Sequence, residues 1–433
     1  MLSYALAELP PPFGFPADTN VSANQIKGGY VAGTAQSPYL KAAVRWDGVV
    51  SQQLLTKATG YGVNANGDVV GTMIPDGNKY ATAFVYADGD LTLLNGPLGA
   101  IKNHNALAVN VHRMLVGMID GGGIDVSGPD SAFTYDAKNG GAPTLIPTPA
   151  GFDVAYAVAI NDVGEVLCWC EAFDLNDFEH NHALIFRPGE PLQDLGTVFA
   201  AGDINVHGVV VGHRRFDPQS MVHHAFRLDA SAGTPAEDLG APTDFSYSEA
   251  RAINDDGVIV GTASKTYGGE PPMQRRAHVY VPEGDDAGWH ALSNLTNDNG
   301  WTLEVATSID NDGTIVGYGR YGGYQRGFRL QPVTPQSIIE AKVGDFVSGF
   351  IMMFGGAEKG GAGVGVTPGG IGWPIPPHGP RILPPEVRDA AIGMALDELA
   401  NGIDNRVSRE QLRRTAEDIV ERAVAKIRSA RRA

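Results

Sequence analysis

Histidines crowd the middle of the chain, where their side chains could bind a transition metal. Six of the 11 fall there: His180, His182, His207, His213, His223 and His224. Such a site needs three or four of these side chains to converge on one point. However, His182 and His224 occupy the same place in two copies of a repeated phrase, and equivalent side chains of successive repeats point apart. We therefore expect repeat-consensus and surface histidines here, and no metal site.

Two acidic segments resemble calcium-binding loops: the run Asn297-Asp298-Asn299, and the pair Asp310 and Asp312. A calcium ion needs six or more oxygen ligands, and the sequence has no twelve-residue loop that ends in a glutamate. Asp, Asn and Gly are also the residues that β-turns use. We therefore predict turns at both segments, and no bound cofactor.

The sequence contains no motif for nucleophilic catalysis. GxSxG and HExxH are absent, and the two cysteines, Cys168 and Cys170, have no base at a motif spacing. We expect both cysteines to be buried as small apolar residues. The paired carboxylates Glu237 and Asp238 fall in a predicted turn or outer strand, where water would surround them. The sequence therefore favours a protein that is not an enzyme.

One phrase, repeated seven times, provides the elements that would position these residues. Its clearest copy is ARAINDDGVIVG, from Ala250 to Gly261, in which Asp-Gly lies between two β-branched runs. This arrangement predicts a hairpin, because glycine tolerates the positive φ of tight turns. The copies align on the residue that closes the second strand: Gly33, Gly71, Gly117, Cys168, Gly212, Gly261 and Gly317.

Each copy continues with a third apolar strand, such as TAFVY from Thr82 or HAFRL from His224, and most add a short fourth segment, such as LQDLG. Four short strands per repeat, at a period of about 40–50 residues, are typical of β-propeller blades. One such sheet cannot bury both of its faces, whereas blades packed around an axis cover each other. The sequence thus predicts an all-β fold, a seven-bladed β-propeller of four-stranded blades, over residues 1–333.

Equivalent positions of the repeats carry similar side chains. Glycine and alanine recur in the first two strands, as expected close to the axis, where large side chains would clash. One aromatic position recurs in the third strands: Trp46, Tyr86, Tyr135, Phe186 and Tyr280. We interpret these rings as the core between blades and not as a carbohydrate-binding platform.

The two ends of the repeat region complement each other. The seventh copy stops at GFRLQPV without a fourth segment, whereas YALAEL, from Tyr4 to Leu9, precedes the first copy and has the pattern of the missing strand. We expect this N-terminal strand to complete the last blade and to close the ring without a covalent link. The first copy is the least regular, because residues 24–27 add to its turn, and this leaves six or eight blades as alternatives.

The phrases AINDDGVIVG, from Ala252 to Gly261, and HAF, from His224 to Phe226, resemble the HAF repeat family. That family occurs in bacterial proteins and is described as probable extracellular repeats. The resemblance covers roughly residues 1–331; it implies an exported repeat protein and carries no catalytic motif. The chain itself begins with MLSYALAELPPPFGF, which lacks a basic n-region and a long apolar h-region, so the sequence as given predicts a cytoplasmic location.

Charge and hydropathy exclude two classes of partner. The formal net charge is -17 at pH 7, whereas a nucleic-acid-binding surface needs clustered Lys and Arg. No apolar run approaches the ~20 residues of a transmembrane helix. We therefore expect neither nucleic-acid binding nor a transmembrane segment.

The composition changes after Gln331. Residues 334–385 combine an amphipathic segment, Ser337 to Phe354, with a Gly- and Pro-rich linker, and residues 386–433 predict a small α-helical C-terminal tail. Its helices are expected from Glu386 to Leu399 and from Ser408 to Arg428. The second of them opens with a capping box formed by Ser408 and Gln411.

Apolar side chains of this C-terminal region are the candidates for docking a partner or a second copy. They are Phe346, Phe350, Ile351, Met353, Phe354, Leu412, Ile419 and Ile427. If exposed, they would form the kind of apolar patch that interfaces use. Two alternatives stay open for the first segment: a core helix packed on the propeller, and a membrane-surface anchor.

Two functions from different classes fit these features. The sequence favours a non-enzymatic binding or scaffold protein, in which a rigid propeller is the recognition platform and the tail docks a protein partner or another copy. The alternative is an enzyme at the mouth of the central channel, a hydrolase or lyase acting on carbohydrate or peptide, and a small ligand there fits either function. A weaker alternative is a structural subunit of a larger assembly. Perturbed pKa values at the channel would favour the enzyme, and a channel of small residues would favour binding.

Overall fold

The computed structural model describes residues 2–77, 79–94, 103–119, 130–172, 181–217, 219–266, 274–297 and 300–333, and every structural statement below refers to them. The chain divides into two units, Met1–Pro332 and Val333–Ala433. The predicted amphipathic segment, linker and helical tail lie outside the described residues and stay predictions. Within the described residues, no helix is long and apolar enough to span a membrane.

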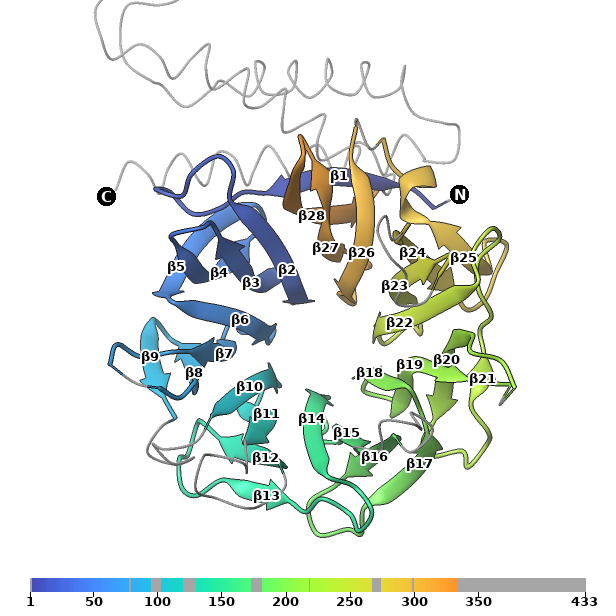
Figure 1. The fold of residues 1–433 in the computed structure, drawn as a ribbon, viewed down its shortest axis with the longest axis horizontal. Helices are drawn as coiled ribbons and strands as arrows, with labels where there is room; N and C mark the ends of the chain where they lie inside the picture. The colour runs from blue at the N-terminus through green and yellow to red at the C-terminus, as the bar shows by residue number, and fades with distance from the viewer. Residues whose placement is uncertain are drawn as a thin grey trace, which may run out of the picture. The chain divides into compact units, whose positions relative to one another are not determined.

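Seven four-stranded antiparallel sheets make up the first unit, and each sheet is one blade of a β-propeller (Figure 1). Blade 1 contains β2 (Asn20–Lys27), β3 (Tyr30–Gln36), β4 (Lys41–Asp47) and β5 (Val50–Thr56); blade 2 contains β6 (Ala58–Val63), β7 (Val69–Met73), β8 (Thr82–Ala87) and β9 (Asp90–Leu93). Blade 3 contains β10 (His104–Val109), β11 (Met114–Ile119), β12 (Ser131–Asp136) and β13 (Thr144–Ile146); blade 4 contains β14 (Val154–Ile160), β15 (Val166–Glu171), β16 (His182–Phe186) and β17 (Gln193–Thr197). Blade 5 contains β18 (Ala200–Ile204), β19 (Val209–Arg215), β20 (His223–Asp229) and β21 (Glu237–Asp238); blade 6 contains β22 (Tyr247–Ile253), β23 (Ile259–Ser264), β24 (Arg276–Val281) and β25 (Gly288–Ala291), followed by the 3-10 helix η2 (Leu292–Asn294). Blade 7 contains β26 (Thr302–Ile309), β27 (Ile315–Tyr321), β28 (Tyr324–Pro332) and β1 (Tyr4–Leu9). The predicted fold of seven four-stranded blades is confirmed.

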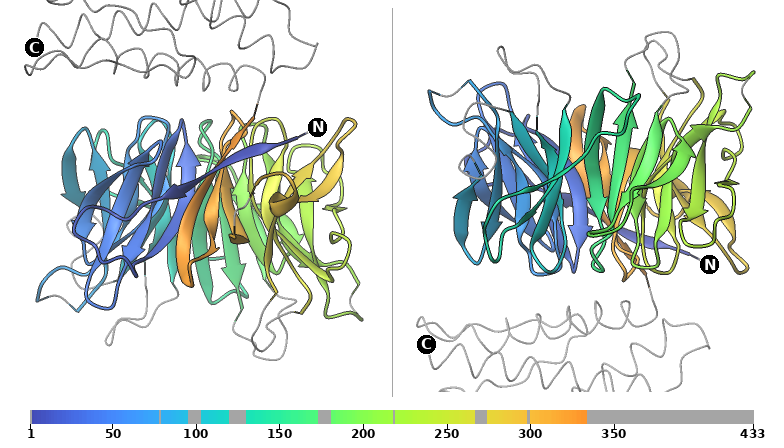
Figure 2. Two further views of the ribbon diagram at one scale, coloured as in Figure 1. Left: turned by 90° about the horizontal axis from the view of Figure 1, so that it is seen from above. Right: turned by 90° about the horizontal axis from the view of Figure 1, so that it is seen from below.

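The first strand of each blade lies nearest the axis of the ring (Figure 1). Seen from the side, the strands cross the ring from one face to the other (Figure 2). In each blade, the loop between the second and third strands therefore lies on the same face of the ring as the connection that leads from the fourth strand to the next blade. We call this face the upper face. The turns between first and second strands lie on the opposite, lower face.

The N-terminal strand closes the ring as predicted. β1 pairs antiparallel with β28, in a register that runs from Tyr4 opposite Pro332 to Leu9 opposite Gly327. Leu9 is fully buried and packs with Trp46 and Val21 of blade 1. The first and last blades are thus joined by strand pairing and by a shared apolar core.

Every innermost strand has a register shift at an equivalent position, and this explains the recurrent glycine of the second strand. In blade 2 the shift falls between Gly60 and Gly62. A Cβ on Gly71, which pairs with Gly60, would lie 2.0 Å from the main-chain oxygen of Thr59 and 2.8 Å from the Phe84 ring. In blade 2 only glycine leaves room for this close approach, whereas blade 4 has Cys168 at the equivalent position.

Blade 1 is as regular as the others, which corrects one prediction. Residues 24–27 were expected to enlarge a turn, but they belong to β2, where Gln25 pairs with Ala32. Its register shift, between Ala23 and Gln25, is the one that all blades share. The extra residue is a β-bulge of the repeat and not an insertion. The alternatives of six or eight blades are therefore excluded.

The aromatic position of the third strands is largely core. Trp46 and Tyr135 are buried, whereas Tyr86, Phe186 and Tyr280 are half-buried and pack against buried clusters. Most of these clusters combine residues of neighbouring blades, as expected for sheets that cover each other.

A ring of buried asparagines links the blades on the lower face. The side-chain amide of each donates to the main-chain oxygen of its counterpart in the next blade: Asn64 to Asn110 (2.9 Å), Asn110 to Asn161 (3.2 Å), Asn161 to Asn205 (2.9 Å), Asn205 to Asn254 (3.1 Å) and Asn254 to Asp310 (3.4 Å). The main-chain N–H of Gly29 in blade 1 donates to Asp310 Oδ2 at 2.8 Å. The asparagine of the repeated phrase therefore holds consecutive blades together, and we call this set the asparagine belt.

Candidate functional site

The cysteines and the predicted docking residues offer no site among the described residues. Cys168 and Cys170 are buried in β15, and burial raises the pKa of both thiols, that of Cys170 to about 12. Thiols in this state are weak nucleophiles. The eight apolar docking candidates, from Phe346 to Ile427, lie outside the described residues and stay predictions.

The repeat histidines are structural. His182 Nδ1 lies 2.9 Å from Asp194 Oδ2, and His224 Nδ1 lies 3.0 Å from Asp238 Oδ1, so each histidine joins the third strand of its blade to the fourth. His180 lies outside the described residues, and His207 is exposed in a turn. No three His, Cys, Asp or Glu side chains of the described residues are placed to hold a metal ion.

Two other histidines come together at the upper end of blades 5 and 6. The ring of His213 lies near that of His223, with 6.1 Å between their centroids. The ring of Phe199 stacks on that of His223, with 4.3 Å between their centroids. Tyr247 of β22 contacts His223 edge-on at 6.4 Å. Glu249, two residues further along β22, lies near both histidines. We call these five residues the blade 5–6 cluster.

Burial and charge set the protonation states in this cluster. Burial lowers the pKa of His213 to about 4, although the nearby Glu249 acts in the opposite direction. Burial also lowers the pKa of His223. For Glu249 burial alone would raise the pKa, but the positive charge of Arg251 and the nearness of His213 bring it below its usual value. At neutral pH the cluster thus holds two neutral imidazoles and one carboxylate.

Arginines lie near Glu249 and near His223. Arg251 Nη2 donates to Glu249 Oε2 at 2.8 Å, and Arg275 is close enough to lower the pKa of Glu249. Arg215 pairs in register with His223 and lowers its pKa by repulsion. Two of these guanidinium groups, those of Arg251 and Arg275, therefore act on the carboxylate of Glu249, in a chain whose net charge is -17.

A further perturbed group lies on an innermost strand. Asp203 accepts hydrogen bonds from the main-chain N–H of Ile204 (2.9 Å) and of Ile253 (3.3 Å), and burial raises its pKa. The positive charge of Lys27 in blade 1 opposes this effect, because it lowers the pKa of Asp203. The inner wall thus carries charged groups as well as small residues.

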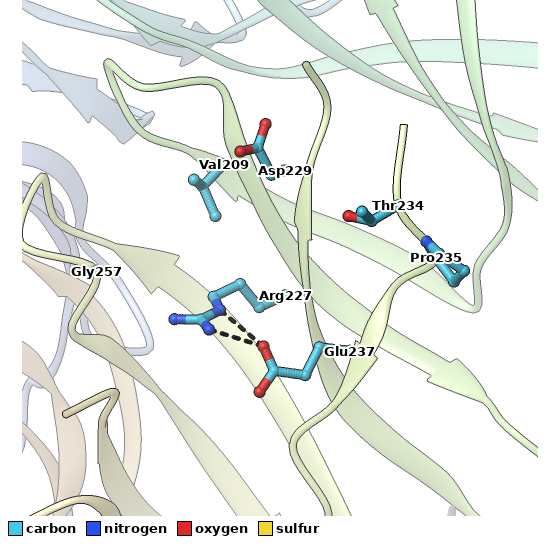
Figure 3. Close-up of a pocket in the computed structure, with 7 residues that line it drawn as sticks. All are labelled: Val209, Arg227, Asp229, Thr234, Pro235, Glu237 and Gly257. Carbon is cyan, nitrogen blue, oxygen red and sulfur yellow. Dashed lines mark hydrogen bonds and ion pairs between the residues drawn. The ribbon is translucent and has the colours of Figure 1, made fainter. Parts of the chain in front are cut away.

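A shallow cavity of about 280 Å³ lies between the outer part of blade 5 and the turn of blade 6 at Gly257 (Figure 3). Its floor includes Arg227 and Glu237, which form an ion pair with Nη2 2.8 Å from Oε2. Because each charge already has its partner, we assign no ligand to this cavity.

Large apolar side chains are exposed on the upper face over blades 7, 1 and 2. Tyr321 and Tyr324 flank the two-residue turn between β27 and β28, Tyr39 and Leu40 lie between β3 and β4, and Ile74 follows β7. We call these five residues the apolar rim. Tyr39 is 92% exposed and Ile74 is 52% exposed.

Hydrogen bonds show that the segments of the apolar rim adjoin. The main-chain N–H of Lys57 donates to the oxygen of Lys41, next to Leu40, and the N–H of Ile74 donates to the oxygen of Lys57. On the other side, the N–H of Gln325, next to Tyr324, donates to Asn20 Oδ1 of blade 1.

Comparison with known proteins gives the fold a context and assigns no activity. Residues 193–332, from the start of β17 to the end of β28, match a family described as "Protein of unknown function (DUF3466)". No curated protein matches the chain. Neither result tests the resemblance to HAF repeats, which stays a prediction.

Several solved structures are similar in fold at low identity. The β-propeller domain of the Trilobed protease from Pyrococcus furiosus is 12% identical, with 73% of this chain and 98% of that chain covered and a TM-score of 0.48. The acylaminoacyl peptidase of Pyrococcus horikoshii is 10% identical, with 71% and 52% covered and a TM-score of 0.46. The sialidase of Trypanosoma rangeli is 10% identical, with 83% and 60% covered and a TM-score of 0.35. This chain therefore spans little more than half of the last two proteins.

No motif in the sequence points to the blade 5–6 cluster as a whole. His213 and His223 were noted there, but Phe199, Tyr247 and Glu249 were not. Their meeting depends on how blade 5 packs on blade 6. Aligning the repeats on Gly212 and Gly261 could have shown that both blades carry polar side chains beside the anchor position.

Proposed function

We propose that this protein is a non-enzymatic recognition platform that binds a protein partner through the apolar rim. The observation that carries the proposal is the exposure of five large side chains, on adjoining segments of three neighbouring blades, at one face of the ring. Single exposed apolar residues are normal on a protein surface, whereas a contiguous group is typical of an interaction site.

The chemistry of the apolar rim suits a protein partner. Three of its five side chains are tyrosines, which bury a large ring and keep a hydroxyl for a hydrogen bond, and tyrosine is enriched among the residues that dominate binding energy. Trp301 stacks under Tyr321 with 5.2 Å between ring centroids, which fixes one of these rings before any partner arrives.

The scaffold beneath the apolar rim is pre-organised. The asparagine belt and the pairing of β1 with β28 hold the blades in one arrangement. A rigid surface loses little conformational entropy when it binds, so more of the contact energy appears as affinity.

The C-terminal region would act as a second docking element in this proposal. Its candidate residues, from Phe346 to Ile427, lie outside the described residues, and their amphipathic spacing is the only support. Light scattering of the full chain and of a version that ends at Val333 tests this part. Loss of an oligomer on truncation supports it, and two monomers of unchanged fold contradict self-association through the tail.

The alternative, an enzyme at the channel mouth, has one observation in its favour. His213, Glu249 and Asp203 have shifted pKa values, as catalytic groups often do. Yet a base should have a pKa near the working pH, and that of His213 is about 4. Glu249, whose pKa is lowered, holds no proton to donate as an acid. We therefore rank catalysis second.

Affinity capture with matched variants tests the main proposal. A Tyr39→Ser and Tyr321→Ser double variant removes two rings of the apolar rim, and Leu145→Ser removes another exposed apolar side chain, on the outer edge of blade 3. We expect proteins of the source organism that are retained by the wild type and the Leu145 control to be lost from the double variant. Identical retention by all three would contradict the proposal.

A further inference from the structure

We infer that Phe13 is an anchor for the protein partner of the apolar rim, and that its ring enters an apolar pocket on that partner. This inference rests on the proposed function, because it assigns a further contact to the same partner. Three observations support it: the full exposure of the ring, the fixed turn that carries it, and hydrogen bonds that join its segment to the apolar rim.

Phe13 is the most exposed large apolar side chain of the described residues, at 105%. It lies between β1 and β2, on the connection that leads from blade 7 to blade 1 at the upper face. Phe15, two residues further on, is half-buried and packs on the cluster that contains Leu9 and Trp46. The same segment thus buries one phenyl ring and holds the other in water, where a large apolar surface is unfavourable.

The backbone of the turn that carries Phe13 is fixed. The main-chain N–H of Phe15 donates to the oxygen of Pro12 at 3.2 Å, so that Phe13 and Gly14 form the tip of a β-turn. Pro12 is buried, and Gly14 has a φ of 93°, a value that favours glycine. The exposure of the Phe13 ring therefore follows from the shape of the turn.

Two side chains of blade 1 hold the segment that precedes this turn. Trp46 Nε1 donates to the main-chain oxygen of Pro10 at 2.8 Å, and Ser51 Oγ donates to that of Pro11 at 3.3 Å. An aromatic ring on a fixed backbone loses only side-chain freedom when it binds, so more of the contact energy appears as affinity.

Arg326 joins the other end of the segment to the apolar rim. Its guanidinium group donates to the main-chain oxygens of Thr19 (2.6 Å) and Ala17 (2.5 Å). The same group lies over the ring of Tyr324, a residue of the apolar rim, at 5.1 Å from the centroid. One side chain thus holds both the segment of Phe13 and a ring of the apolar rim, which favours a single continuous binding surface.

The chemistry of Phe13 indicates the kind of partner. A phenyl ring has no hydrogen-bonding group, so an apolar pocket is the site that gains most from receiving it. Aromatic anchors that fill such pockets carry much of the binding energy of protein interfaces. A membrane surface is the weaker alternative, because one ring buries little apolar area in lipid and a chain with a net charge of -17 is repelled by anionic lipids.

Biolayer interferometry of the full chain with the partner that the wild type retains tests the inference. Phe13→Ser should weaken binding at least tenfold, and Phe13→Leu, which keeps an apolar side chain, should weaken it less than threefold. The matched control Val163→Ser removes an exposed apolar side chain from a turn on the lower face and should leave the affinity unchanged. Because both side chains are exposed, all three variants should keep the melting temperature of the wild type.

The Tyr39→Ser and Tyr321→Ser double variant separates this inference from the proposed function. If the double variant loses binding while Phe13→Ser binds as the wild type does, the inference is overturned and the proposed function stands. If Phe13→Ser loses binding and the double variant does not, the anchor is supported and the apolar rim is contradicted. Equal binding by all variants, or no retained partner, would overturn both.

Sedimentation with vesicles of phosphatidylcholine and phosphatidylglycerol tests the alternative of a membrane. We expect the wild type to stay in the supernatant. Sedimentation with the vesicles that Phe13→Ser abolishes would place the ring in lipid and would overturn the inference.

Discussion

The side-chain amide of Asn205 donates a hydrogen bond to the main-chain oxygen of Asn254 in the next blade, at 3.1 Å. The other side-chain atom of Asn205, Oδ1, accepts from the main-chain N–H groups of His207 (3.1 Å) and Val209 (3.0 Å) in its own turn. One side chain thus shapes a hairpin and links two blades. This double role explains why asparagine recurs at the end of the first strand.

Removal of one belt asparagine should destabilise the ring. Asn205→Ala deletes the bond to Asn254 and leaves the turn N–H groups without their acceptor, so we expect a loss of about 2–3 kcal/mol in the free energy of unfolding. Denaturant titration measures it. Asn66→Ala, which removes an exposed bond to Val111, is the matched control and should cost less than about 1 kcal/mol. An equal loss of unfolding free energy in the two variants would contradict the proposal that the asparagine belt stabilises the ring.

The seam between the first and last blades depends on Leu9. Leu9→Ala should lower the free energy of unfolding by about 2–5 kcal/mol, because the side chain is fully buried between β1 and blade 1. Leu145→Ala, at a half-exposed position, should change it by less than about 0.5 kcal/mol. If Leu9→Ala were as mild as the control, pairing of β1 would not be what closes the ring in solution.

Stability should depend on pH through His213. Burial lowers its pKa from 6.5 to about 4, so the unfolded chain takes up this proton more readily than the folded protein. The stabilisation is present above pH 6.5 and is lost as the pH falls toward about 4. Since one pKa unit corresponds to about 1.4 kcal/mol, the difference between 6.5 and about 4 predicts a loss of about 3 kcal/mol in the free energy of unfolding. His213→Gln should flatten the curve of unfolding free energy in this range, and His207→Gln, in an exposed turn, should not.

The cysteines should report on unfolding and on nothing else. Cys168 and Cys170 are buried, and burial raises both pKa values. The native protein should therefore react with a thiol reagent at about pH 8 only as fast as it opens. The rate should rise when Leu9→Ala is introduced. Rapid modification of the native protein would contradict the burial of β15.

The strands could be predicted well from the sequence because the seven copies of the repeat can be aligned, so that a clear copy shows where the strands of a less clear copy begin and end. The turn of one clear copy, Ala250 to Gly261, located the turns of six more, and the orphan strand Tyr4–Leu9 fitted the one blade that lacked a fourth strand. The error at residues 24–27 arose because a β-bulge adds a residue without a sequence signal, and the same bulge in other blades passed unnoticed.

The candidate sites could not be predicted in the same way. Tyr39 lies in the first blade of the sequence and Tyr321 in the last, and only closure of the ring makes these two blades neighbours. Glu249 and His213 meet because blade 6 packs on blade 5, and hydrophobic periodicity says nothing about which polar groups face each other across blades. The repeated phrase therefore predicts where the strands lie, whereas the candidate sites consist of side chains that differ from one copy to the next.

Site-specific photo-crosslinking tests the recognition platform most directly. A photoreactive phenylalanine analogue would replace Tyr39, Tyr321 or Ile74 in the apolar rim, and Leu145 or Val163 at exposed positions elsewhere. The account predicts that the three rim positions yield the same crosslinked protein in cells of the source organism, and that the two control positions yield none of it. Crosslinking to that protein from Leu145 or Val163 with equal yield, or no crosslink from any rim position, would contradict the account.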